Sequence, residues 1–150
     1  MTTPYDVPPD KLIEKTAKKL AENKEITPPT WSEAVKTGRH REKVPTQKDW
    51  WFIRLAAILR KIYLKGPIGT ERLASEFGGK RDRGSKPHHA VKGSRSIVRK
   101  GLQQLEKVGL VDTLKGRGRQ ISPSGQSFLD NVSNEVKKEV SAQITGLKKY

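Results

Sequence analysis

The sequence predicts a mainly α-helical protein: a helical bundle around one central apolar helix, with a small β-hairpin after a second amphipathic helix. Three observations predict this class. Residues 50–65 form the most hydrophobic segment, and residues 94–109 carry an apolar arc at helical spacing. Residues 110–121 place short apolar runs on either side of a glycine-rich basic turn. Helical periodicity therefore dominates, and the strand signals are confined to one hairpin.

A first helix is predicted over residues 9–23, because Ile13, Ala17 and Leu20 lie along one stripe and lysines occupy the other positions. We expect this helix on the outside of the bundle.

A second, shorter helix is predicted from Thr30 to Gly38. Thr30 and Glu33 have the spacing of a capping box, and Gly38 supplies a C-terminal signal. Trp31 and Val35 are its expected inward residues.

The central helix is predicted from Trp50 to Lys65, with Asp49 as its cap and Gly66-Pro67 as its end. Its apolar residues cover more than half a turn, so we expect contacts on several sides. Its polar side is a narrow strip that must face solvent or a ligand. The strip contains Trp50, Arg54, Lys61 and Lys65, while Arg60 stands apart among apolar neighbours.

A shorter helix follows from Gly69 to Phe77, with Leu73, Ala74 and Phe77 facing inward. Residues 78–93 are then predicted to form a long basic loop, in a place where a helix-turn-helix normally has a turn of about 3 to 4 residues. A loop of this length in a compact domain is either functional or disordered.

The last part of the chain has the pattern of a winged helix. After the helix that ends at Gly109, residues 110–121 predict a hairpin wing whose tip carries Lys115, Arg117 and Arg119. Ser122-Pro123 caps and opens a long C-terminal helix, residues 123–146, which closes the bundle through a stripe from Phe128 to Ile144. We expect one domain over residues 1–150. Its winged-helix-like part spans about 49–130, and helices within 8–38 and 123–146 pack on it.

Charge indicates the kind of partner. The chain has 31 Lys and Arg against 16 Asp and Glu, a formal net charge of +15. Such a surface attracts polyanions. Its apolar runs are too short to span a membrane, and it has no cysteine and no signal-peptide pattern at its start. We therefore expect a cytoplasmic nucleic-acid binder.

Catalytic and metal chemistry have no candidate residues. His88 and His89 are adjacent, His40 is remote, and no ligand spacing is recognisable. No serine sits in a nucleophile elbow, and the glycine-rich segments lack P-loop spacing. We expect no enzyme activity, no cofactor and no metal.

Two alternatives remain open within the chain. Trp50 is either a core residue or a platform for base stacking, whereas Trp51 is expected in the core. The charged residues of the helices are either a solvated face or contacts to nucleic acid. Their coincidence with a basic loop and a basic wing favours contact, as in the case of Arg54, Lys61, Arg95 and Arg99.

Several segments resemble the archaeal and eukaryotic small-subunit ribosomal protein family numbered nineteen, the e-type that bacteria lack. The resemblance covers nearly the whole chain. It is carried by Trp31 in Pro-Pro-Thr-Trp, Asp49–Ala56, Tyr63–Gly66, Phe77–Gly79, Gly93–Ser96, Arg99, Leu102–Glu106 and Gly118–Gln126. Ala90 departs from the aromatic residue that the family usually has there, so the resemblance supports no stacking contact at that position.

The resemblance implies a place in the head of the small ribosomal subunit and a role in late maturation of its RNA. The implied partners are small-subunit ribosomal RNA and neighbouring proteins, and we expect a monomer when the protein is free. Together with the strip, the loop and the wing, it predicts these RNA-binding residues: Trp50, Arg54, Arg60, Lys61, Lys80, Arg81, Arg83, Lys86, His89, Lys92, Arg95, Arg99, Lys115, Arg117 and Arg119.

The predicted function is that of a structural constituent of the small subunit, which binds folded RNA through phosphates and by shape. The competing hypothesis is a winged-helix transcription regulator that reads duplex DNA, usually as a dimer. An enzyme acting on RNA has no candidate acid, base or metal.

Overall fold

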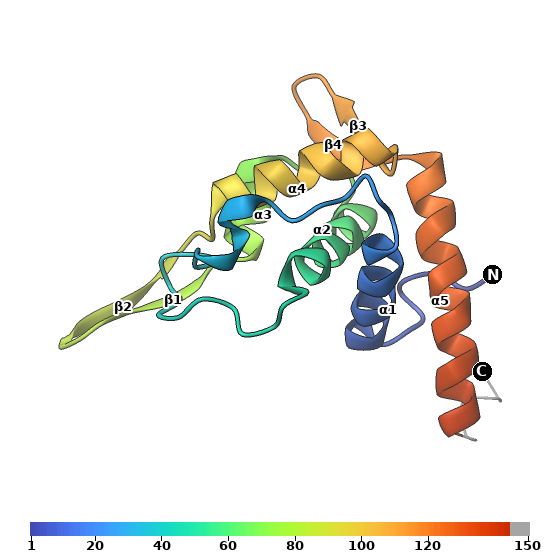
Figure 1. Ribbon diagram of the computed structural model, residues 1–150, viewed down its shortest axis with the longest axis horizontal. Helices are drawn as coiled ribbons and strands as arrows, with labels where there is room; N and C mark the ends of the chain where they lie inside the picture. The colour runs from blue at the N-terminus through green and yellow to red at the C-terminus, as the bar shows by residue number, and fades with distance from the viewer. Residues whose placement is uncertain (145–150) are drawn as a thin grey trace.

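The computed structural model describes residues 1–144 and is mainly α-helical, as predicted (Figure 1). A helical body carries two β-hairpins that point away from it in different directions. In chain order the elements are α1 (Pro9–Ala21), the 3₁₀ helix η1 (Thr30–Glu33), α2 (Trp50–Lys65), α3 (Thr70–Glu76), β1 (Gly79–Arg83), β2 (Lys86–Val91), α4 (Arg95–Val108), β3 (Val111–Leu114), β4 (Gly118–Ile121) and α5 (Pro123–Gln143).

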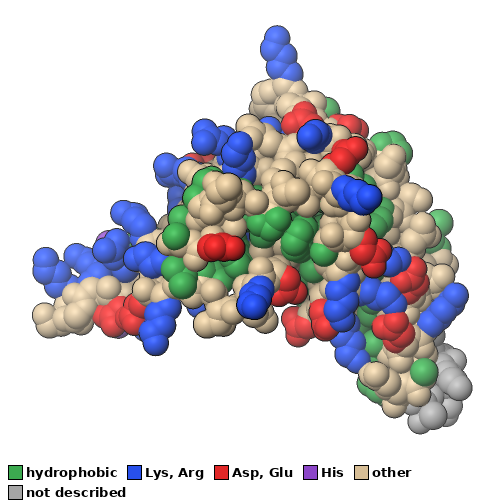
Figure 2. Space-filling view, viewed as in Figure 1, with side chains coloured by type: hydrophobic (Ala, Val, Ile, Leu, Met, Phe, Trp, Pro, Cys, Tyr) green, Lys and Arg blue, Asp and Glu red, His purple; other side chains and the backbone are tan. Residues whose placement is uncertain are grey.

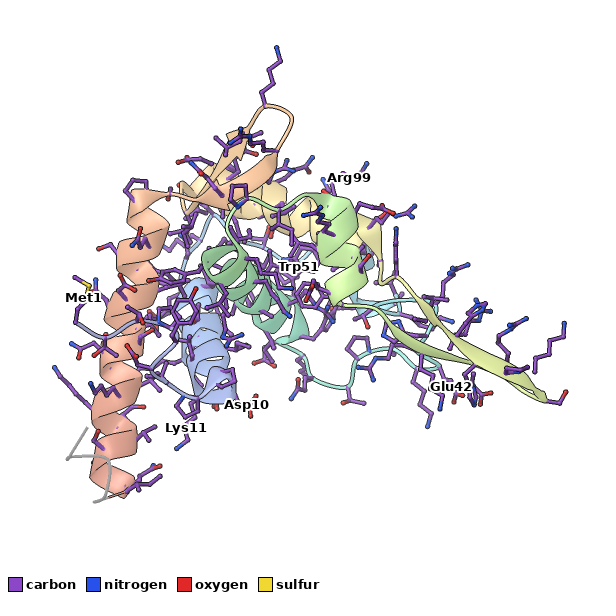
Figure 3. The ribbon with its side chains drawn as sticks, turned by 180° about the vertical axis from the view of Figure 1, so that it is seen from behind. Met1, Asp10, Lys11, Glu42, Trp51 and Arg99 are labelled. Carbon is purple, nitrogen blue, oxygen red and sulfur yellow. The ribbon has the colours of Figure 1, made fainter. Side chains whose placement is uncertain are left out.

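Helix α2 is the centre of the core, which confirms the prediction. Its residues Leu55, Ile58 and Leu59 are at most 1% exposed. The indole of Trp51, also buried, donates a hydrogen bond of 2.8 Å to the side-chain oxygen of Gln104 on α4, as expected of a buried tryptophan. Figure 3 shows Trp51 among the helices. Asp49 does stand at the N-cap position, but its side chain makes no capping hydrogen bond, so that part of the prediction is wrong.

Helix α1 lies between α2 and α5 rather than on the outside, contrary to the prediction. Its buried apolar residues are Leu12, Ala17 and Leu20, while Ile13 is only half-buried. One face of the helix packs against α2 and another against α5, so its buried residues do not lie along a single stripe.

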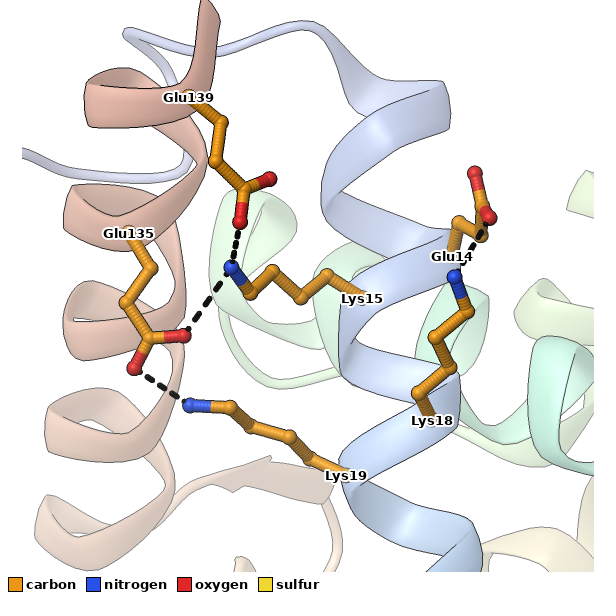
Figure 4. A network of polar contacts seen from close by, with 6 residues as sticks. All are labelled: Glu14, Lys15, Lys18, Lys19, Glu135 and Glu139. Atoms are coloured by element: carbon orange, nitrogen blue, oxygen red, sulfur yellow. Dashed lines mark hydrogen bonds and ion pairs between the residues drawn. The ribbon is translucent and has the colours of Figure 1, made fainter.

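Ion pairs join α1 to α5 (Figure 4). The ammonium of Lys15 lies 3.3 Å from one carboxylate oxygen of Glu135 and also contacts Glu139, and that of Lys19 lies 2.6 Å from the other oxygen of Glu135. These contacts lower the pKa of Glu135 below its usual value, chiefly through the hydrogen bond from Lys19. The two helices therefore neutralise one another.

The helix predicted over residues 30–38 is reduced to the single turn η1, so this prediction is wrong in length. The capping box does not form, because the 3₁₀ turn begins after Pro29 without a side-chain cap. Trp31 and Val35 still pack against the core, and the ring of Trp31 meets that of Trp51 edge-on at 5.9 Å.

The segment from α4 to α5 matches the winged-helix prediction. Ser94 caps α4 by accepting a 3.4 Å hydrogen bond from the Ile97 amide, and Gly109 ends the helix with φ of 84°. Strands β3 and β4 pair antiparallel to form the wing. Ser122 caps α5 by accepting from the Gly125 amide at 3.0 Å.

The segment predicted to be a loop, residues 78–93, is instead the antiparallel β1–β2 hairpin. Both of its faces are exposed along most of its length, so no apolar alternation marked the strands. Between the pairs Arg81–His89 and Arg83–Lys86 the register shifts, and Pro87 and His88 stand opposite the single residue Asp82. A bulge of this kind is one of the few places in a strand that tolerate proline.

Helix α5 ends at Gln143, and Ile144, predicted on its buried stripe, is 53% exposed. The remainder of the predicted helix, residues 145–146, and the tail 148–150 lie outside the described residues.

A hydrogen bond links α2 to α5: the hydroxyl of Tyr63 donates to Asp130 at 2.8 Å. Burial and that carboxylate raise the pKa of Tyr63 to about 12.

Candidate nucleic-acid interface

Positive charge is concentrated at one end of the molecule. From Gly79 to Lys100 the chain has eight cations and one carboxylate, whereas α1 and α5 together have six cations and five carboxylates. Figure 2 shows lysine and arginine side chains along the projecting β1–β2 hairpin, and mixed charges over the opposite end. The segment from Gly79 to Lys100 therefore has a net charge of +7 out of the +15 of the whole chain, whereas α1 and α5 together contribute only +1.

The β1–β2 hairpin presents the predicted residues Lys80, Arg81, Arg83, Lys86 and His89 together. Every residue from 80 to 90 is exposed. No ion pair to a carboxylate is formed by these arginines and lysines within residues 1–144; Arg83 instead lies 3.3 Å from the His89 ring. The structure thus brings five predicted contacts onto one projection, although sequence reasoning had placed them on an irregular loop.

The start of α4 adds a second cationic element beside the hairpin root. Arg99 and Lys100 are exposed, and Arg99 lies at the surface in Figure 3. Lys92 and Arg95 are both held by Glu71 of α3, with 2.7 Å between the Arg95 Nε and a Glu71 oxygen. These contacts lower the pKa of Glu71, the hydrogen bond from Lys92 most of all.

A groove of about 1210 Å³ runs between η1 and the start of α4; we call it the α4 groove. Its lining includes the cations Lys36, Arg39, Lys92, Arg95, Arg99 and Lys100, and it includes no carboxylate. Lys36, Arg39 and Lys100 were missed by the site prediction. Their charge was visible in the sequence, and Lys100 directly follows Arg99. Lys36 and Arg39 come to the start of α4 only because Thr37 and Gly38 pair with Ser94 and Gly93 through the main chain.

The residues of the polar strip of α2 have different surroundings in the structure. Lys61 and Lys65 both pair with Glu76 of α3, at 2.8 and 2.5 Å. The guanidinium of Arg54 lies 4.3 Å from the centre of the Phe77 ring, a cation–π contact. Arg60 is half-buried, and its Nε has no hydrogen-bond partner in the described part of the chain. The strip is therefore not a uniform contact surface.

Trp50 is neither fully buried nor fully exposed, so its role in base stacking stays a prediction. Its ring packs edge-on against Trp51 at 5.6 Å, yet Trp50 is only half-buried and lines a second groove. Trp51 is a core residue, as predicted.

The wing carries fewer available charges than predicted. Lys115 and Arg117 are exposed at its tip, where Gly116 has φ of 77°. Arg119 lies within β4, half-buried, with 3.6 Å between its guanidinium and Glu106. Its placement at the tip was wrong, because the hairpin turns before Arg119.

His40 is part of the junction from which the β1–β2 hairpin leaves the body. A Cβ on Gly38 or Gly79 would approach its ring to 2.7 or 2.9 Å, so both glycines permit close packing. Burial, followed by the nearby charges of Arg41 and Arg54, lowers the pKa of His40. This environment favours the neutral form of the imidazole.

The chemistry that this surface offers is polyanion binding. Guanidinium and ammonium groups on a hairpin and at the start of a helix suit phosphate oxygens. Among the described residues, no group of three or more His, Asp or Glu is placed to hold a metal ion, and no helix has both the length and the apolar character to cross a membrane.

The fold and this surface define a class: a small, strongly basic protein of winged-helix type with one cationic face. Comparison with known families narrows the class. The family model of ribosomal protein S19e matches residues 3–139, and the chain belongs to that family.

Its relatives include curated proteins from archaea and a eukaryote. The small ribosomal subunit protein eS19 of Thermoplasma acidophilum is 46% identical over 96% of this chain and 95% of its own length. That of Aeropyrum pernix is 45% identical over the whole of this chain and 99% of its own. The small ribosomal subunit protein eS19A of Schizosaccharomyces pombe is 40% identical over 91% of this chain and 94% of its own. The match to a ribosomal family disfavours the transcription regulator.

Proposed function

We propose that this protein is a structural, non-enzymatic constituent of the small ribosomal subunit and binds ribosomal RNA through the face formed by the β1–β2 hairpin, the start of α4 and the α4 groove. Its family and the names of its relatives support the first part. The second part rests on one observation: eight cations and a single carboxylate between Gly79 and Lys100, most of them exposed.

The shape of this face suits folded RNA. The major groove of an A-form helix is too deep and narrow for side chains to read, so RNA duplexes are recognised by phosphates and shape. A hairpin with two exposed faces can enter between neighbouring RNA helices and contact phosphates on both sides. The winged-helix-like part, about residues 49–130, would therefore serve as an RNA-binding unit without a recognition helix in a major groove.

Several finer statements belong to the same proposal. The resemblance supports a position in the head of the subunit, a contribution to late maturation of its RNA, and a cytoplasmic location. Neighbouring small-subunit proteins are the expected protein partners. The charge of +15 makes copies of the free protein repel one another, which favours a monomer before assembly.

Sedimentation of a lysate through sucrose gradients, first at physiological and then at high salt, tests the proposal. The protein should travel in one-to-one ratio with the small subunit. Arg99→Glu should move the protein to the top of the gradient without changing its thermal midpoint, because Arg99 is exposed.

Lys138→Glu is the matched control, since Lys138 is an exposed cation on α5, away from the proposed face. Absence of the wild-type protein from ribosomal fractions, with recovery on duplex DNA, would overturn the proposal in favour of the regulator. Co-sedimentation of a folded Arg99→Glu protein would reject Arg99 as a contact.

A further inference from the structure

Helix α3 supplies a carboxylate to the cationic face from outside the segment that carries the charge. The guanidinium of Arg95 donates to both carboxylate oxygens of Glu71, with its Nε 2.7 Å from one oxygen and its Nη2 3.0 Å from the other. The ammonium of Lys92 also donates to Glu71. One carboxylate thus holds the two cations that directly follow the β1–β2 hairpin.

The contact between Glu71 and Arg95 has the geometry by which arginine binds a phosphate. A guanidinium presents N–H groups in a planar fork, and two oxygens of a carboxylate or of a phosphate fit the same fork. A carboxylate and a backbone phosphate also carry the same single negative charge. Glu71 therefore occupies the place that a phosphate would take between Lys92 and Arg95.

The other cations of the face have no carboxylate partner. Of the eight cations between Gly79 and Lys100, Lys92 and Arg95 are the two that form ion pairs within residues 1–144. The four cations of the β1–β2 hairpin, together with Arg99 and Lys100, are exposed. The face is therefore open to anions along the hairpin and at Arg99, and is neutralised at the point between them.

The ion pairs of Glu71 add little to the stability of the folded state, because all three side chains are exposed. The side chain of Glu71 is 54% exposed, and those of Lys92 and Arg95 are 45% and 63% exposed. Water and salt screen exposed pairs of this kind. Their effect falls instead on binding, since a phosphate gains contact with these cations only by displacing an anion.

This competition affects two kinds of polyanion differently. A flexible single strand settles on whichever cations are free, so its affinity follows the number of available charges. A folded RNA brings its phosphates to fixed positions and is recognised by shape. In the proposed function those positions face the hairpin, Arg99 and Lys100. Neutralising Lys92 and Arg95 therefore weakens binding of the flexible strand more than binding of the folded RNA.

We propose that Glu71 determines specificity: it withholds Lys92 and Arg95 from flexible polyanions, so that the cationic face favours a folded RNA. The identification of the folded partner as RNA rests on the proposed function. Lys92 and Arg95, which the sequence predicts as RNA contacts, would remain bound to Glu71 in the complex.

Glu71→Gln tests the proposal, because glutamine keeps the length of the side chain and removes its charge. Glu14→Gln is the matched control: Glu14 pairs with the exposed Lys18 within α1, so the same change in net charge is made away from the cationic face. Affinities are measured at several salt concentrations for poly(U), as the flexible strand, and for a folded transcript of small-subunit ribosomal RNA.

Glu71→Gln should raise the affinity for poly(U) about fivefold to tenfold over the control. The slope of log affinity against log salt should steepen by about 0.7 to 1.4, because one or two more cations contact phosphates of a single strand. Affinity for the transcript should stay within about twofold of the control. The thermal midpoint should change by about 2 °C or less, as expected for exposed ion pairs.

A triple variant attributes the gain to the two cations. Adding Lys92→Gln and Arg95→Gln to Glu71→Gln should abolish the gain in affinity for poly(U). A gain that persists in the triple variant would overturn the proposal, since the released cations would not be its cause.

Three other results would overturn the proposal. Equal affinities of Glu71→Gln and Glu14→Gln for poly(U) would show that Glu71 withholds nothing. Equal gains for poly(U) and the transcript would show competition without discrimination. A lower midpoint with weaker binding of both RNAs would give Glu71 a purely structural role.

Failure of the wild-type protein to bind the transcript more tightly than poly(U) would instead count against the proposed function. The comparison of Glu71→Gln with Glu14→Gln on poly(U) does not depend on the transcript, so the two failures are distinguishable.

Discussion

The two β-hairpins of this protein are attached to the body in opposite ways. In the β3–β4 hairpin, Val111 is 1% exposed, and Ile68 and Arg119 exchange two main-chain hydrogen bonds of 3.0 Å. In the β1–β2 hairpin only Val91, at its end, is buried. The β3–β4 hairpin is therefore anchored to the body by a buried side chain and by main-chain hydrogen bonds. The β1–β2 hairpin has no buried side chain along its length except Val91.

The root of the β1–β2 hairpin explains how it keeps a direction without a buried face. The amide of Gly93 donates a 2.8 Å hydrogen bond to the carbonyl of Ala74. A Cβ on Gly78 would lie 2.2 Å from the Val91 carbonyl oxygen, so the two chains meet at a distance that requires glycine. The comparison teaches that the two hairpins differ in what they contribute: the wing completes the core, while β1–β2 displays the charge on which the proposed RNA contact depends.

The largest expected effect concerns salt. If about 6 to 10 phosphates are neutralised, the affinity for ribosomal RNA should fall by about 10³ to 10⁵ between 50 and 200 mM salt, a range established for duplex DNA. Filter binding at several salt concentrations measures the slope. A slope corresponding to one or two phosphates would remove the basis for a contact face that spans a whole hairpin.

Charge removal should then separate the two hairpins. Lys80→Gln, Arg81→Gln, Arg83→Gln and Lys86→Gln together should lower RNA affinity by about 100-fold and reduce the salt slope by about 3 to 4. Lys115→Gln with Arg117→Gln at the wing tip should cost about tenfold or less. Equal losses per charge in the two variants would break the comparison. Both sets are exposed, so the thermal midpoints should stay unchanged.

Substitution of a glycine should destabilise the protein more in the β3–β4 hairpin than in the β1–β2 hairpin, the reverse of the order expected for RNA affinity. Gly118 has φ of 90°, and a Cβ there would lie 2.5 Å from the Ile68 carbonyl oxygen, whereas Gly84 has φ of 71° and open space around it. Gly118→Ala should cost about 3 kcal/mol, through strain and clash, and lower the midpoint by about 6 to 12 °C. Gly84→Ala should cost about 1 kcal/mol. Thermal unfolding followed by circular dichroism measures both.

The smallest expected effect is a loss of folding stability at acidic pH, caused by Glu76 of α3 near the root of the β1–β2 hairpin. Hydrogen bonds from Lys61 and Lys65 lower the pKa of Glu76 to about 2, from an ordinary value of 4.5. A carboxyl with a depressed pKa in the folded state stabilises it above pH 4.5, and this contribution is lost as the pH falls toward 2. Because Glu76 is partly exposed, the effect should be about 1 kcal/mol or less.

Glu76→Gln should therefore flatten the dependence of stability on pH between 5 and 2, as measured by urea unfolding. Glu106→Gln, beside the wing, is the comparison. An equal or larger flattening in Glu106→Gln would contradict the assignment of the effect to Glu76.

Much of the fold could be predicted from the sequence because its signals are local. The bounds of α2, the cap at Ser122 and the glycine turns of the wing depend on residues within a few positions of one another. The β1–β2 hairpin could not be predicted, since a strand exposed on both faces has no apolar period. The Thr30–Glu33 capping box failed for the converse reason: its spacing was right, but the helix it would cap never extends beyond one turn.

The sequence by itself determined the helical class, the apolar identity of α2, the wing and the strongly positive charge, because composition and periodicity carry these properties. Only the tertiary structure decided which cations are available. Glu71, Glu76 and Glu106 reach Arg95, Lys61 and Arg119 across gaps of 13 to 24 residues, whereas Arg54 packs on the Phe77 ring and forms no ion pair within residues 1–144. Charge pairing depends on distance in space, and sequence spacing does not fix that distance once the helices have packed.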